Sequence, residues 1–190
     1  MRFFLRNLFC VTLTTPETKG FLDTMDTIVV GADHAGYALK ERLAQSLREQ
    51  GFTVEDVGCY SEASVDYPAI SGQLAKKFQE ITKKTGHAPR GILCCGSGIG
   101  IMIGANRFPW LRAAVVHEHF SAMMSRRHND TNVICFGARV IAPELALELL
   151  QTWLDTPFEG IRHQGRVDML GDLHLNTVES QAGPGGVPSC

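Results

Sequence analysis

The sequence predicts a three-layer α/β protein built on a five-stranded, mostly parallel sheet. Two observations lead to this fold class. Five short runs rich in β-branched and apolar residues recur along the middle of the chain, and segments with helical periodicity separate them. Strands that alternate with helices are joined by right-handed crossovers, so they run parallel and carry helices on both faces of the sheet.

The predicted strands are short, as strands of a central sheet usually are. In chain order they are TIVVGA (27–32), TVEDVG (53–58), GILCC (91–95), RAAVV (112–116) and NVICFGA (132–138).

Helical segments are expected between these strands. In the first, apolar residues recur three and four positions apart until Gly51, where a helix would stop. Pro68 can open the second, because proline is favoured in the first turn of a helix. A short helix is expected after the glycines at 96–100, and two more helices are expected over 119–127 and 143–154.

The two ends of the chain differ from the middle. Residues 1–25 are basic and lack a clear period, so we expect an extension outside the core, either a segment upstream of a start at Met25 or a presequence. Residues 26–172 form the predicted domain. Residues 173–190, which end in GPGGVPSC, are expected to be a flexible tail.

The composition excludes several classes of function. The 190 residues include 18 Lys and Arg against 20 Asp and Glu, and this net charge of −2 provides no basic field for nucleic acid or an anionic membrane. No apolar run reaches the roughly 20 residues that cross a bilayer. The six cysteines show no CxxC spacing, so neither a metal site nor a redox dithiol is indicated. We expect free thiols in a cytoplasmic protein, with organelle targeting by residues 1–25 left open.

Polar residues collect where the predicted strands end. Asp33 and His34 follow the first strand, Cys95 and a glycine-rich loop end the third, His117 follows the fourth, and Arg139 follows the fifth. Ligands of open α/β sheets bind at this carboxyl edge. Taken singly, Asp33 could cap a helix and His34 could be an exposed loop residue. Together these residues predict a site that combines a carboxylate, an imidazole, a thiol and a guanidinium.

The loop Gly96-Ser97-Gly98-Ile99-Gly100 is the strongest single motif. Glycines allow backbone N–H groups to converge at the start of a helix, where a phosphate or an oxyanion would be stabilised. The spacing does not match GxGxxG, and the loop follows the third strand rather than the first, which disfavours an NAD(P)-dependent oxidoreductase. The structural alternative is a tight glycine turn without a ligand.

Cys95 stands immediately before this loop. Amide dipoles directed at its sulfur would lower the pKa of the thiol, so that it could act as a nucleophile or as a proton-abstracting base. Cys94 should point to the opposite face of the strand, because adjacent side chains alternate. We expect Cys59, Cys94 and Cys135 to be buried as small hydrophobic residues.

Two basic segments lie outside this edge. Arg162 and Arg166 are spaced i, i+4, and on a helix their two guanidiniums would suit a phosphate or carboxylate; a solvated basic face is the alternative. His128 comes at the end of the helix that follows the fourth strand. About ten residues at roughly 1.5 Å each place it about 15 Å from the edge that holds Cys95. His128 is therefore either a local helix-end residue or part of the active site of a second subunit.

Six segments in register resemble the type B ribose-5-phosphate isomerases, a family that includes allose-6-phosphate and galactose-6-phosphate isomerases. They are GADHAGYALK, DYP (66–68), CGSGIGIMIGANR (95–107), RRHNDTNV (126–133), FGAR (136–139) and RHQGR (162–166). The resemblance covers about residues 26–170. It implies a Rossmann-like fold, a homodimer or dimer of dimers with shared active sites, a phosphorylated sugar as substrate, and no metal or cofactor.

The resemblance also implies catalytic roles. Cys95 is the base that moves a proton between C1 and C2 of the sugar, and Ser97 holds the enediolate oxygens together with the loop amides. Asp33 handles hydroxyl protons or positions the sugar, and His128 opens the furanose ring. One branch of the family has a glutamate base where this chain has Ile101, so the chain resembles the cysteine branch.

The remaining matched positions are expected to bind the substrate. Tyr67 lines the sugar pocket and Asn129 stands beside His128. The loop positions that face the oxygens are Gly96, Gly98, Ile99 and Gly100. The phosphate-binding positions are His34, Arg139, Arg162, His163 and Arg166.

The expected function is therefore the interconversion of ribose 5-phosphate and ribulose 5-phosphate through an enediolate. A related hexose-6-phosphate isomerase of the allose or galactose type is the first alternative, because a single sequence does not give the depth of the pocket. A non-catalytic phosphate-binding α/β module is the second, and it would leave Cys95, His128 and the RHQGR segment without a shared purpose.

Overall fold

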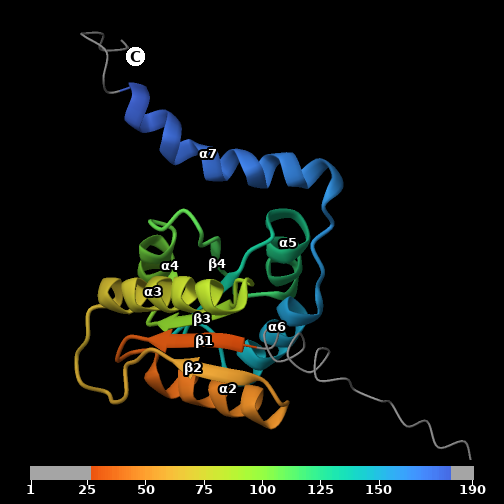
Figure 1. The fold of residues 1–190 in the computed structure, drawn as a ribbon. Coiled ribbons are helices and arrows are strands. Elements are labelled where there is room, and N and C mark those ends of the chain that lie inside the picture. Colours follow the sequence, from red (N-terminus) through yellow and green to blue (C-terminus); the bar gives the residue numbers. More distant parts are fainter. Residues whose placement is uncertain (1–26, 181–190) are drawn as a thin grey trace, which may run out of the picture.

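The structure is a computed structural model that describes residues 27–180, and its centre is one parallel sheet (Figure 1). The strands are β1 (Thr27–Ala32), β2 (Thr53–Asp56), β3 (Arg90–Cys95), β4 (Ala113–Val115) and β5 (Val133–Gly137). Their order across the sheet is β2-β1-β3-β5-β4, and every neighbouring pair is parallel. The predicted fold class is confirmed, and the sheet is parallel throughout the described residues.

Helices cover both faces of this sheet (Figure 1). They are α2 (Tyr37–Glu49), α3 (Tyr67–Thr85), α4 (Ile99–Ala105), α5 (His119–Asn129), α6 (Pro143–Asp155) and α7 (Gln164–Ser180), with a short 3₁₀ helix η1 (Ile161–His163) before α7. Apolar residues of α2 and α6 form one core cluster with alternate strand residues such as Ile28 and Ile134. Residues of α3 and α4 form the second cluster with Val29, Leu93 and Val133 on the opposite face. Because strand side chains alternate, one sheet supplies both cores.

Several element boundaries differ from the sequence prediction. Strand β2 ends at Asp56 rather than at residue 58, because Gly58 has a φ of 108° and turns the chain. Helix α5 continues to Asn129, so His128 lies within its last turn. Helix α7 runs to Ser180, so residues 173–180 are helical although we expected a flexible tail to begin at 173. The expected extension over residues 1–25 and the tail from 181 onward lie outside the described residues.

The buried ammonium of Lys40 on α2 holds the chain that leaves β2. Its Nζ donates to Oδ2 of Asp56 at 2.6 Å and to the carbonyl oxygen of Cys59 at 2.8 Å, and it pairs with Glu41 at 2.8 Å. Burial alone would lower the pKa of Lys40, but the hydrogen bonds to the Asp56 and Glu41 carboxylates outweigh this effect and raise it. The lysine therefore stays charged and fixes the start of the connection that leads to Tyr67.

The cysteines inside the fold divide as expected. Cys94 belongs to the core cluster under α2 and α6, whereas Cys95 and Cys135 belong to the cluster under α3 and α4. Burial raises the pKa of the Cys94 and Cys135 thiols, so both stay protonated. Cys59 is also buried, which confirms the predicted placement of these three residues. Cys10 and Cys190 lie outside the described residues.

Within residues 27–180, none of the helices combines the length and the apolar character that crossing a membrane requires.

Gly36 marks the tightest approach between a helix and the sheet. A Cβ at this position would lie 2.5 Å from the main-chain carbon and oxygen of Cys94, whereas a Cβ on Gly72 in the interior of α3 would meet nothing within 4 Å. We expect Gly36→Ala to lower the free energy of unfolding by about 1–3 kcal/mol, because the main chain of β3 cannot yield without disturbing the sheet. Gly72→Ala is the matched control and should raise it by about 0.5–1 kcal/mol. Urea denaturation checks both, and equal stabilities would contradict the close approach.

Candidate active site

A cavity of about 520 Å³ opens at the carboxyl edge of the sheet. It brings together predicted site residues from four separate segments of the chain, since its lining includes residues that follow β1, begin α3, follow β3 and follow β5. The predicted residues in its wall are Asp33, His34, Tyr67, Cys95, Gly96, Ser97, Gly100 and Arg139. The topology therefore assembles a carboxylate, an imidazole, a thiol, a hydroxyl and a guanidinium around one space.

Asp33 is fixed by the turn that leads into α2. Its Oδ1 accepts the backbone N–H groups of Ala35 at 2.9 Å and Gly36 at 3.0 Å, and its own N–H donates to the carbonyl oxygen of Cys94 at 3.1 Å. The side chain is 7% exposed. One carboxylate oxygen thus orders the turn before α2, and the residue also lines the cavity. The N-cap of α2 is Gly36 and has no side-chain cap, so Asp33 does not cap this helix.

His34 is oriented by the loop before α3. Nδ1 of His34 lies 3.3 Å from the main-chain nitrogen of Val65 and 3.4 Å from its carbonyl oxygen, so Nδ1 contacts Val65 whichever ring nitrogen carries the proton. This contact leaves Nε2 for a ligand in the cavity, whose wall includes His34.

Cys95 lies at the base of the cavity and is 4% exposed. The backbone N–H of Gly98 donates to its Sγ at 3.0 Å, which is the amide contact that the glycine loop predicted. Gly98 has a φ of 80°, and a Cβ there would lie 2.7 Å from Val115 Cγ2 and 3.1 Å from the nitrogen of Gly137. Only glycine fits, so this N–H is held against the sulfur, where it would stabilise negative charge.

The rest of the loop departs from the expected oxyanion arrangement. The N–H of Ile99 donates to Oγ of Ser97 at 3.3 Å, and the N–H of Gly98 is directed at sulfur. Gly98 and Ile99 are absent from the wall of the cavity, whereas Gly96, Ser97 and Gly100 form part of it. Gly100 is needed for a different reason, because a Cβ there would lie 2.8 Å from the ring of Tyr67.

A second group of predicted residues lies elsewhere. The imidazole rings of His128 on α5 and His163 on η1 stack with centroids 4.1 Å apart and planes 9° apart. Nε of Arg162 donates to Nε2 of His163 at 3.2 Å. Burial, together with the charges of His128 and Arg162, lowers the pKa of His163, so it is neutral near pH 7. None of these residues lines the cavity that holds Cys95.

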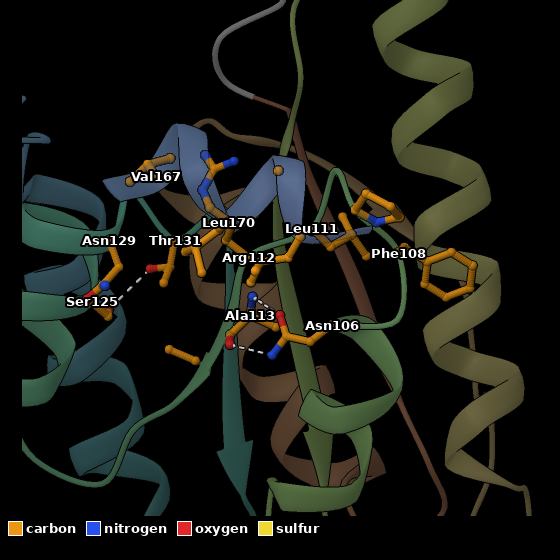
Figure 2. Close-up of a pocket in the computed structure, with 14 residues that line it drawn as sticks. Asn106, Phe108, Leu111, Arg112, Ala113, Ser125, Asn129, Thr131, Val167 and Leu170 are labelled. Atoms are coloured by element: carbon orange, nitrogen blue, oxygen red, sulfur yellow. Dashed lines mark hydrogen bonds between the residues drawn. The ribbon is translucent and has the colours of Figure 1, made fainter. Parts of the chain in front are cut away.

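Asn129 and the start of α7 border another cavity, of about 460 Å³ (Figure 2). Figure 2 shows Val167 and Leu170 of α7 above it, with Asn129 and Thr131 on one side and Phe108 on the other. Arg166, which we expected beside Arg162 on one helix face, is an exposed residue of α7, whereas Arg162 belongs to the 3₁₀ helix before it. The structure thus sorts the predicted site residues into a cavity group around Cys95 and a helix-end group around His128.

Glu159 belongs to the helix-end group and was missed by the sequence analysis. Its Oε2 lies 3.5 Å from Nε2 of His128 and 4.0 Å from Nε2 of His163. The sequence feature that could have identified Glu159 is its position four residues before His163, close to the RHQGR segment. Nε2 of His119 lies 3.7 Å from Oε2 of Glu148, outside both groups.

His128, Glu159 and His163 are also the one group of potential metal ligands within residues 27–180. Two features make them a poor metal site. The lone pairs of stacked imidazoles lie in nearly parallel planes, so they do not converge on one ion, and Nε2 of His163 already accepts an N–H from Arg162. The described residues thus offer no well-formed metal centre.

Cys95 should be distinguishable from the other thiols in the fold by its reactivity. It borders a cavity, whereas Cys94 and Cys135 are fully buried with raised pKa values. We expect iodoacetamide to alkylate Cys95 at least tenfold faster than Cys94 or Cys135 in the native protein. Time-resolved tandem mass spectrometry, with Cys95→Ala as the control, measures this. Equal rates for the three would contradict the assignment.

Comparisons with known proteins show which family this chain belongs to. The family model described as Ribose/Galactose Isomerase matches residues 28–170. Ribose-5-phosphate isomerase B of Escherichia coli is 43% identical over 146 residues, which cover 77% of this chain and 95% of that protein. A protein of Pectobacterium atrosepticum named D-erythrulose-4-phosphate isomerase is 40% identical over 149 residues, which cover 77% of this chain and 94% of that protein.

A solved structure of a related protein has the same fold. The ribose-5-phosphate isomerase B of Clostridium thermocellum has a TM-score of 0.73 and 41% sequence identity, and the match covers 80% of this chain and 99% of that one. The region shared with these proteins contains both the cavity around Cys95 and the helix-end group around His128. On the fold, the cavity and these matches, the chain belongs to the ribose/galactose isomerase family.

Proposed function

We propose that this protein interconverts ribose 5-phosphate and ribulose 5-phosphate through an enediolate. The observation that carries the proposal is the placement of the Cys95 thiol, under the Gly98 amide, in a cavity that it shares with Asp33 and Arg139. The proteins named ribose-5-phosphate isomerase B in Escherichia coli and Clostridium thermocellum support the choice of substrate.

The residue types suit each chemical step. Cys95, as the thiolate, removes a proton from C2 of the open-chain aldose and returns it to C1 of the enediolate. Ser97 presents a hydroxyl in the cavity wall for an enediolate oxygen, and Asp33 presents a carboxylate for the transfer of hydroxyl protons. His128 opens the furanose ring before this proton transfer begins. No step requires a metal or an organic cofactor.

The phosphate does not react, and its binding holds the sugar in register. His34 and Arg139 supply an imidazole and a guanidinium within the cavity. Arg162, His163 and Arg166 supply further donors in the helix-end group, where Arg162 and Arg166 are exposed.

We also propose that the active sites are shared between two copies of the chain. The ring-opening histidine lies in a different group from Cys95, so the cavity of one copy would be completed by the helix-end group of the other. Apolar side chains are exposed in both regions, which suits burial between copies. They are Tyr67 (42% exposed), Ile99 (49%) and Val140 (54%) near the cavity, and Met169 (67%) and Leu170 (48%) on α7.

Other substrates remain alternatives within the same chemistry. The relative named D-erythrulose-4-phosphate isomerase favours a test with a four-carbon substrate, and the hexose 6-phosphates of the allose and galactose type stay candidates. A non-catalytic phosphate-binding role would not use the Cys95 thiol. We further propose that the protein acts in the cytoplasm.

The first test is a direct assay in the presence of EDTA. We expect the purified protein to convert ribose 5-phosphate to ribulose 5-phosphate at an undiminished rate, and Cys95→Ala to lose at least 100-fold in kcat, because general-base catalysis supplies about that factor. Cys59→Ala, another buried thiol, is the control and should retain activity. Full activity of Cys95→Ala would remove the assigned base.

The second test is complementation between inactive variants. Cys95→Ala disables the cavity group and His128→Ala disables the helix-end group, so each variant alone should have little activity. After subunit exchange, a mixed dimer would contain one intact site, and we expect up to about a quarter of wild-type activity from a statistical mixture of the two variants. Activity that stays at the level of the separate variants, with exchange verified by mass spectrometry, would argue against shared sites.

A further inference from the structure

We propose that Glu159 is the positioning residue of the ring-opening step, acting through His128 rather than on the sugar itself. This inference rests on the proposed function. The carboxylate oxygen Oε2 lies 3.5 Å from Nε2 of His128, within reach of a charge-assisted hydrogen bond after a small side-chain rotation. Such contacts are commonly longer before substrate binds.

The backbone of Glu159 is held to the helix that carries His128. Its N–H donates to the carbonyl oxygen of Arg127 at 3.0 Å, one residue before His128. Gly160 follows with a φ of 67°, which favours glycine, and bends the chain into η1. The backbone N–H of His163 then donates to the Gly160 carbonyl oxygen at 2.8 Å. This turn places the His163 imidazole near the Glu159 carboxylate. Glu159 is therefore placed by main-chain contacts on both sides.

The contact restricts both the proton and the ring of His128. A carboxylate that accepts the N–H at Nε2 keeps that proton in place and leaves Nδ1 to exchange a proton with the sugar. The imidazole of His163, whose side chain is 5% exposed, stacks on the ring of His128 and limits its rotation. Because His163 is neutral, it can stack on His128 without adding a positive charge. Glu159 thus supplies the negative charge of this imidazole pair.

Ring opening is the step that such an oriented imidazole would serve. It breaks the bond between C1 and the ring oxygen, the anomeric hydroxyl loses a proton as the aldehyde forms, and the ring oxygen gains one. The protons balance, so no co-reactant is required. Proton transfer between C1 and C2 is a separate event at Cys95 and does not involve Glu159.

Ribulose 5-phosphate separates the two steps experimentally. Its O5 carries the phosphate, so it cannot close a five-membered ring and is an open chain in solution. Exchange of a C1 hydrogen of ribulose 5-phosphate with deuterium from the solvent requires the enediolate and no ring opening. Turnover of ribose 5-phosphate, which is mainly cyclic, requires both steps.

The experiment compares these two rates in Glu159→Gln, which keeps the size of the side chain and removes its charge. We expect the ratio of ribose 5-phosphate turnover to C1 exchange to fall at least tenfold, with kcat rather than KM carrying the loss, because an acid–base group contributes roughly 10²–10⁴-fold. His128→Ala should lower the same ratio further. Coupled spectrophotometry measures turnover, and NMR measures exchange.

Glu148→Gln is the matched control. Glu148 lies 3.7 Å from Nε2 of His119, a contact of the same kind outside both site groups, so its removal should leave the ratio unchanged. An equal fall in turnover and exchange for Glu159→Gln would mean that Glu159 supports the fold or the phosphate site, and would overturn the proposal. Unchanged rates would overturn it as well. Failure of the wild-type protein to convert ribose 5-phosphate would instead refute the proposed function.

Discussion

The cavity depends on main-chain crowding at the carboxyl end of β3. Gly36, Gly98 and Gly137 each occupy a position where a Cβ would come within 3.1 Å of backbone atoms, those of Cys94, of Phe136 and Gly137, and of Ser97. Because three segments meet there without side chains between them, the Gly98 amide reaches the sulfur of Cys95 and the turn of Asp33 reaches the strand. A small set of glycines thus brings the thiol, its amide donor and the carboxylate together.

The division of the site into two groups follows from the direction of the helices. Residues that directly follow strands stay at the carboxyl edge, whereas α5 carries His128 away from it, and the chain from α6 to η1 brings Glu159 and His163 to the same helix end. Each group has one cation and one carboxylate of its own. Arg139 and Asp33 line the cavity. Arg162 contacts His163, and Glu159 lies beside His128.

Much of the fold could be predicted because buried parallel strands leave a strong signal. Apolar runs located all five strands, and the rule that ligands bind at the carboxyl edge brought Asp33, Cys95 and Arg139 together. An amide contact with the Cys95 sulfur was predicted, but the sequence could not show that Gly98 makes it or that the Ile99 amide turns to Oγ of Ser97, because both depend on backbone torsions. The sequence analysis missed Glu159 because this residue lies in an irregular segment between α6 and η1, where no periodicity indicates which side chains face the site.

The helical segment 173–180 shows another limit of composition. The expectation of a tail was based on the Gly/Pro-rich end of the chain, but those residues begin at 183, after the last described turn of α7. The residues before them include ordinary helix formers such as Leu175 and Glu179. The prediction gave more weight to the adjacent GPGGVPSC segment and therefore began the tail too early.

The opposed directions of Cys94 and Cys95 have a consequence for oxidative damage. Cys94 is fully buried in one core cluster, while Cys95 belongs to the other and borders the cavity. If an oxidant converted the Cys95 sulfur to a sulfenic acid, the adjacent thiol could not reach across the strand to form a disulfide. Cys94 therefore cannot serve as a resolving thiol for Cys95, although it is the adjacent residue in the chain.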